Sequence, residues 1–119
     1  MCMWTLEIPG WQPTPLNRLI GYHWATRSKR KVHDAEIVGR AVKVYGIPPA
    51  TTKRRVSLLV VLPKGKRATD PDSLWKSLLD SLVHAGALKN DSPAWVELAP
   101  VRWARGEALE TFITLEDMR

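Results

Sequence analysis

The chain has 119 residues, of which 45% are hydrophobic and 25% charged, so residues 1–119 are expected to form a single globular domain. No apolar run reaches the roughly 20 residues of a membrane-spanning helix, so we expect no membrane partner. The single cysteine, Cys2, cannot form a disulfide within the chain, and no signal-peptide pattern precedes Trp4. These features predict a cytoplasmic protein.

The net charge of +6 is unevenly distributed along the chain. Residues 1–67 hold 13 basic and 3 acidic residues, whereas the remainder holds 5 basic and 9 acidic residues. A cationic first half followed by an acidic second half indicates a polyanionic partner and a set of carboxylates held close to it. A solvated basic surface without a partner is the alternative, and charge alone does not decide between the two.

Hydrophobic patterns predict three elements in the first half of the chain. Alternation predicts a strand over residues 3–8, and a basic, proline-containing segment over 9–31 predicts a long loop. Helical spacing of apolar residues predicts a helix from Asp34 to Tyr45, where Gly46 provides a stop signal. A run rich in Val and Leu predicts a buried strand over 53–62.

The second half predicts one helix and two strands. Leucines at helical spacing predict an amphipathic helix over 71–84 that ends near Gly86. Alternation over 95–103 and 108–115 predicts two antiparallel strands joined as a hairpin around Arg105 and Gly106. The expected order is β-α-β-α-β-β, which predicts an α/β (α+β) domain with a mixed sheet and two helices.

Three aspartates are candidate metal ligands. Asp70 and Asp72 lie at the start of the predicted helix 71–84, and Asp91 follows it on a loop that would have to fold back toward them. Carboxylate oxygens without a nearby Cys or His pair favour Mg²⁺ or Mn²⁺, which activate water and neutralise charge in phosphodiester hydrolysis. Lys76 lies one turn after Asp72 on the same helical face and is suited to bind a phosphate, and Asp80 continues that face.

Helix capping alone also explains these residues. Asp70 is a typical N-cap before Pro71, and an acidic residue at position 72 is favoured by the helix dipole. Lys76 and Asp80 have the spacing of an ordinary surface ion pair. Asp91 before Ser-Pro could simply start a turn. The spacing leaves both interpretations open.

The run Asp70-x-Asp72-x-Leu74-x-Lys76-x-x-x-Asp80-x-Leu82, followed by Ala85-Gly86 and Asp91, resembles the central signature of the RusA family of Holliday junction resolvases. Pro15-x-Asn17-Arg18 resembles the opening of that family. The resemblance implies a magnesium-dependent, homodimeric endonuclease, often prophage-encoded, that cuts four-way DNA junctions in recombination and repair. It also implies that Asp70, Asp72 and Asp91 are metal-binding catalytic residues and that Lys76 is the essential lysine. Ser73 departs from the usual Asn, and Thr69 from a commonly basic residue.

Basic residues predict a surface that follows DNA phosphates without reading sequence. Lys53 to Arg55 could extend this surface, and Trp11 and Trp24 are candidates for stacking on bases. The residues that we expect to bind DNA are Asn17, Arg18, Arg27, Lys29, Arg30, Lys31, Lys64, Lys66 and Arg67.

We therefore expect a homodimer in which each metal site cuts one strand of branched DNA, bound to the nucleoid in a bacterium. One alternative is a module that binds branched DNA without cutting it, after losing activity through changes such as Ser73. Another is an unrelated interaction protein in which the acidic residues only cap and solvate a helix.

Overall fold

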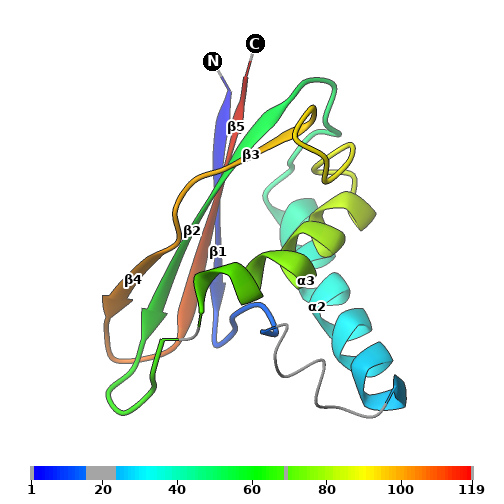
Figure 1. The fold of residues 1–119 in the computed structure, drawn as a ribbon. Coiled ribbons are helices and arrows are strands. Elements are labelled where there is room, and N and C mark those ends of the chain that lie inside the picture. Colours follow the sequence, from blue (N-terminus) through cyan, green and yellow to red (C-terminus); the bar gives the residue numbers. More distant parts are fainter. Residues whose placement is uncertain (1, 16–23, 69, 119) are drawn as a thin grey trace.

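The computed structural model describes residues 2–15, 24–68 and 70–118, and only the backbone of residues 24–28, 30 and 31. Two helices pack against one face of a mixed five-stranded sheet, which confirms the expected α+β class (Figure 1). The elements in chain order are β1 (Met3–Pro9), α2 (Trp24–Val44), β2 (Arg54–Leu62), α3 (Pro71–His84), β3 (Val96–Leu98), β4 (Arg102–Arg105) and β5 (Glu110–Asp117).

The sheet is organised around β2. Strand β5 lies between β1 and β2 and runs antiparallel to both, whereas β3 and β4 pair in parallel with the other side of β2. Side chains of β2 and β5 alternate between buried and more exposed, because only one face of the sheet is covered by helices. The fully buried core includes Leu6, Val38, Val56, Val60, Leu74, Leu78, Leu82, Ile113 and Leu115.

Helix α2 begins at Trp24, ten residues earlier than predicted, so the expected loop over 9–31 is wrong for its last eight residues. The first turns of α2 are rich in Arg and Lys, which favour helix but show no apolar period. Helix α3 spans the predicted residues. In the ranges that the structure describes, neither helix is long and apolar enough to cross a membrane.

The predicted hairpin is also wrong. Strands β4 and β5 do not pair with each other but flank β2 on opposite sides, so the connection after Arg105 passes around the Leu62 end of β2. Gly106 allows this close passage, because a Cβ there would lie 2.6 Å from Cγ1 of Val61. Pro100, which has no N–H to donate, stands in the break that divides the expected strand over 95–103 into β3 and β4.

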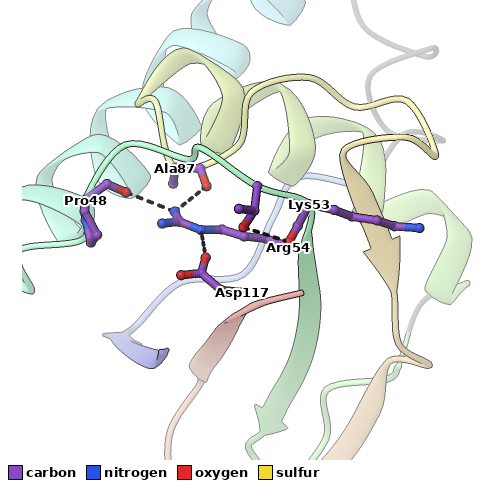
Figure 2. Close-up of polar contacts among 6 residues, drawn as sticks. Pro48, Lys53, Arg54, Ala87 and Asp117 are labelled. Atoms are coloured by element: carbon purple, nitrogen blue, oxygen red, sulfur yellow. Dashed lines mark hydrogen bonds and ion pairs between the residues drawn. The ribbon is translucent and has the colours of Figure 1, made fainter. Parts of the chain in front are cut away.

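Arg54, at the start of β2, is buried and anchors three segments of the chain (Figure 2). Its Nε donates to Oδ1 of Asp117 at 2.7 Å, and Nη1 donates to the carbonyls of Pro48 and Ala87 at 3.0 and 2.8 Å. The guanidinium also lies 4.7 Å from the ring centre of Trp4. Arg54 is therefore a core residue, and the idea that it extends a DNA-binding surface is wrong.

The segment after β1 is tied into the core through Trp11, which is only 7% exposed. Its Nε1 donates to Oδ1 of Asp34 at 3.1 Å, and the backbone N–H of Thr14 donates to Oδ2 of the same carboxylate at 2.9 Å. Asp34 was predicted to start a helix but lies buried in the middle of α2. Trp11 is consequently not available to stack on bases, and the side chain of Trp24 lies outside the described residues.

Candidate functional site

The start of α3 is fixed by Asp70, whose Oδ1 accepts a hydrogen bond from the backbone N–H of Asp72 at 3.2 Å. Ser73, only 8% exposed, donates from Oγ to the backbone carbonyl of Asp70 at 2.7 Å. Pro71 occupies the first helical position, where its missing N–H costs nothing. The capping role predicted for Asp70 is thus confirmed, and it holds the exposed carboxylates of Asp70 and Asp72 two residues apart on a rigid helix start.

Lys76 follows Asp72 by one turn on the exposed side of α3. Its Nζ lies 3.4 Å from Oδ1 of Asp80, and both side chains are about half exposed, at 52% and 43%. An exposed i,i+4 pair of this kind contributes only about 0.3–0.5 kcal/mol to stability. The pair therefore orients the ammonium group along the helix surface without fixing it there.

Asp91 lies at the opposite end of α3, in the loop that Figure 1 shows between α3 and β3. That loop is attached to the beginning of β2, because the carbonyl of Trp95 accepts from the backbone N–H of Arg54 at 3.1 Å. Asp70, by contrast, caps the other end of α3, whose 14 residues span about 21 Å. A single chain does not bring Asp91 to Asp70 and Asp72.

Within the described ranges, no three acidic, histidine or cysteine side chains are grouped closely enough to hold one metal ion. Asp70 and Asp72 nevertheless have the donor chemistry that Mg²⁺ and Mn²⁺ prefer, since each offers exposed carboxylate oxygens. Oδ1 of Asp70 accepts the capping hydrogen bond, and Oδ2 of the same carboxylate is the oxygen that it can offer to a cation. The pair fits an incomplete hard-cation site that needs further oxygen ligands.

A cationic turn precedes these aspartates. Lys64 and Arg67 are exposed and Lys66 half-buried, on the connection from β2 to α3. Asp70 comes three positions after Arg67, which limits their Cα atoms to at most about 11 Å apart. Figure 1 shows this turn, the end of β4 and the start of α3 at the same end of the sheet.

Arg105, at the end of β4, was not among the predicted site residues, yet its side chain contacts the cationic turn. Nη1 of Arg105 donates to the carbonyls of Pro63 and Lys66 at 3.1 and 2.5 Å. The sequence pattern placed Arg105 in a hairpin turn, where it would have no such partner. Only the parallel pairing of β4 with β2 reveals the contact, because it places Arg105 beside Leu62.

The other predicted DNA-binding residues precede α2 in the sequence or belong to it. Lys29 is exposed on this helix. Arg27, Arg30 and Lys31 belong to the same helix, but their side chains lie outside the described part of the chain, as do Asn17 and Arg18 altogether.

The face of the sheet that the helices leave open is acidic rather than basic. Strand register places four glutamates there, at positions 7, 97, 110 and 116, against the arginines at positions 55 and 102. Arg55 lies 2.5 Å from Glu97 and 3.7 Å from Glu116, and the hydrogen bond and charge of Glu97 raise the pKa of its guanidinium. This excess of carboxylates makes the open face electrostatically unfavourable for phosphate groups.

A groove of about 1020 Å³ lies between α2 and α3. Its walls are largely apolar or small, with Val32, Ala35, Gly39 and Val42 on α2 and Ala85 at the end of α3. Neither Asp70 nor Asp72 lines it. The groove is therefore separate from the carboxylate pair.

Comparison with known protein families found no family that matches the chain, and comparison with curated proteins found no matching relative.

Proposed function

We propose that this chain is a magnesium-dependent endodeoxyribonuclease of the RusA type that resolves four-way DNA junctions. The observation that carries the proposal is the start of α3, where Asp70, Asp72 and Lys76 share an exposed surface directly after a cationic turn. Carboxylates beside phosphate-binding cations are the arrangement that metal-dependent phosphodiester hydrolysis requires. The sequence resemblance to RusA resolvases supports the same function.

In this proposal Asp70 and Asp72 hold the divalent cation, which supplies an activated water and neutralises charge on the scissile phosphate. Lys76 places its ammonium group beside the same phosphate and stabilises the charge that develops there. Lys64, Lys66 and Arg67 bind flanking phosphates and set the position of the strand. The pairing of Lys76 with Asp80 limits the conformations of Lys76 before DNA arrives.

Homodimerisation is part of the proposal, because Asp91 lies too far from Asp70 in one chain to share an ion. Helix α3 has 14 residues and is about 21 Å long. If a two-fold axis crossed two copies near the middle of α3, each helix start would lie beside the far end of its partner, and Asp91 of one copy could complete the site of the other. Two such sites would match the two-fold symmetry of a four-way junction.

The second candidate is a module that binds branched DNA without cutting it. Both candidates would associate with the bacterial nucleoid when bound to DNA. The separation of Asp91 from Asp70 in one chain favours the second candidate, as does Ser73, whose hydroxyl is used within the helix cap. Both candidates predict binding to a junction, so cleavage distinguishes them.

The test is cleavage of a synthetic four-way junction with Mg²⁺ or Mn²⁺, compared with linear duplex of the same sequence. We expect symmetrical nicks in the junction, none in the duplex, and loss of nicking with retained binding in Asp70→Asn. Binding without nicking under either metal would favour the second candidate, and absence of binding would reject both.

A further inference from the structure

The cationic turn has a defined backbone conformation. The N–H of Lys66 donates to the carbonyl of Pro63 at 3.2 Å, and Gly65 has a φ of 89°. This combination is typical of a type II turn, which needs glycine at its third position. The hydrogen bond from Lys66 would fix the turn only weakly, because a turn on the surface exchanges it readily for water.

Arg105 strengthens this turn from outside. A single nitrogen, Nη1, donates to the carbonyls of both Pro63 and Lys66, the first and last residues of the turn. Hydrogen bonds from a charged donor contribute about twice as much as neutral ones. The planar guanidinium has a fixed direction, whereas a lysine in the same place would offer one flexible ammonium group.

The position of Arg105 is in turn set by the sheet. It pairs with Leu62, the last residue of β2, and the N–H of Gly106 donates to the carbonyl of Leu62 at 3.1 Å. Gly106 packs so closely on Val61 that the end of β4 has little room to shift. The turn starts at Pro63, directly after Leu62, so the pairing of β4 with β2 fixes the position of Arg105 relative to the turn.

Four cationic side chains lie in or beside this turn. Arg105 adds a fourth positive side chain to Lys64, Lys66 and Arg67, and like charges that are brought together repel. An apolar or amide side chain would have avoided that repulsion. A cation in this place becomes favourable when a bound polyanion offsets the repulsion among the four positive side chains.

We infer that Arg105 is a positioning residue that orders the turn from Pro63 to Lys66, so that Lys64, Lys66 and Arg67 meet the phosphates beside Asp70. The inference rests on the proposed function for its DNA partner. The ordering of the turn can be measured without DNA. The structure also offers a matched control, since Arg102 lies on the same strand but faces the open side of the sheet.

The first experiment measures amide hydrogen exchange of residues 63–67 in the unliganded protein. We expect Lys66 to exchange at least about tenfold faster in Arg105→Lys, while amides of α3 and β2 and those of Arg102→Lys remain unchanged. Unchanged protection of Lys66 would show that Arg105 does not order the turn, whether or not the chain binds DNA.

The second experiment measures junction affinity in a double-mutant cycle of Arg105→Lys and Lys64→Ala. If Arg105 positions the turn, Lys64→Ala should weaken binding about fivefold in the native background and less than about twofold beside Arg105→Lys. Additive effects, or full affinity in Arg105→Lys, would mean that Arg105 contributes charge alone and would overturn the inference. A native protein that binds no junction would reject the proposed function and this DNA role together, while the exchange result still decides the ordering.

Discussion

The Ser77 hydroxyl on α3 donates a 2.5 Å hydrogen bond to Oδ2 of Asp34 on α2. Asp34 is 1% exposed and its carboxylate also accepts from Trp11 and Thr14, so one buried side chain joins both helices to the segment after β1. It accepts hydrogen bonds from three donors and forms no salt bridge with any side chain that the structure describes, so each of those donors is important.

Asp34→Asn is expected to lower the free energy of unfolding by about 1–3 kcal/mol. Whichever way the amide is turned, its NH₂ group faces a donor, either the indole N–H of Trp11 or the backbone N–H of Thr14. Urea denaturation measures the change. Glu36→Gln, an exposed substitution on the same helix, serves as the control and should stay within about 0.5 kcal/mol of the native protein. Equal effects in the two variants would contradict the role given to Asp34.

Arg54→Met is expected to cost about 3 kcal/mol, because it leaves the buried carbonyl of Ala87, the partly buried carbonyl of Pro48 and Asp117 without their donor. Arg55→Met, at the adjacent residue, removes only exposed ion pairs and should cost less than about 1 kcal/mol. Thermal unfolding of both variants provides the comparison. The assignment of Arg54 to the core would be wrong if the two melted alike.

Lys76→Met should abolish junction nicking while reducing junction affinity only slightly, since one charge among many is removed. Asp80→Asn should leave most of the nicking activity, because the exposed pair with Lys76 is weak. Rates of nicking under single-turnover conditions, with binding measured separately, check both statements. A Lys76→Met protein that cuts at the native rate would remove Lys76 from the proposed site.

Mixed dimers test whether the metal site is shared between two copies. A dimer of one Asp91→Asn chain and one Asp70→Asn/Asp72→Asn chain contains one intact site if Asp91 acts in the partner, and none if it acts in its own chain. We therefore expect the mixture to nick one strand of the junction, although each parent is inactive. Differently tagged chains, co-expressed and purified through both tags, provide the sample, and complete inactivity would exclude the shared site.

Junction affinity should fall steeply with salt, by roughly 0.9 units of log affinity per unit of log salt for each phosphate contact. Arg67→Ala should reduce that slope by about one contact, whereas Lys53→Ala, at the other end of β2, should leave it unchanged. Titrations at several salt concentrations measure the slopes. A slope that is flat in the native protein would contradict a phosphate-binding surface at the α3 end of the sheet.

Local patterns predicted those elements whose buried face is continuous in sequence. The leucines of α3 and the run of Val and Leu in β2 predicted spans that agree with the structure to within one residue, because each of these elements packs a regular stripe against the core. The first turns of α2 lack such a stripe, and the pairing of β4 and β5 depends on β2, which lies some forty residues away. Non-local pairing leaves no signal in a single hydrophobic period.

In the candidate site, too, local interactions were predictable from the sequence and contacts between distant segments were not. Asp70 as a cap and Asp72 one residue into the helix were predictable, because capping is a local interaction. The contact of Arg105 with the cationic turn was not, since it requires knowing which strand lies beside Leu62. The burial of Arg54 was missed for a similar reason, because its partners come from three distant segments.

The position of β5 between β1 and β2 has a consequence for biosynthesis. The first strand to leave the ribosome gains its neighbour only when residues 110–117 have been made, so β1 must wait without a hydrogen-bonded partner through most of translation. Folding of this sheet is then a late, concerted event and not a stepwise addition of strands. Premature termination before residue 110 would release a chain whose exposed strand edges favour aggregation and degradation.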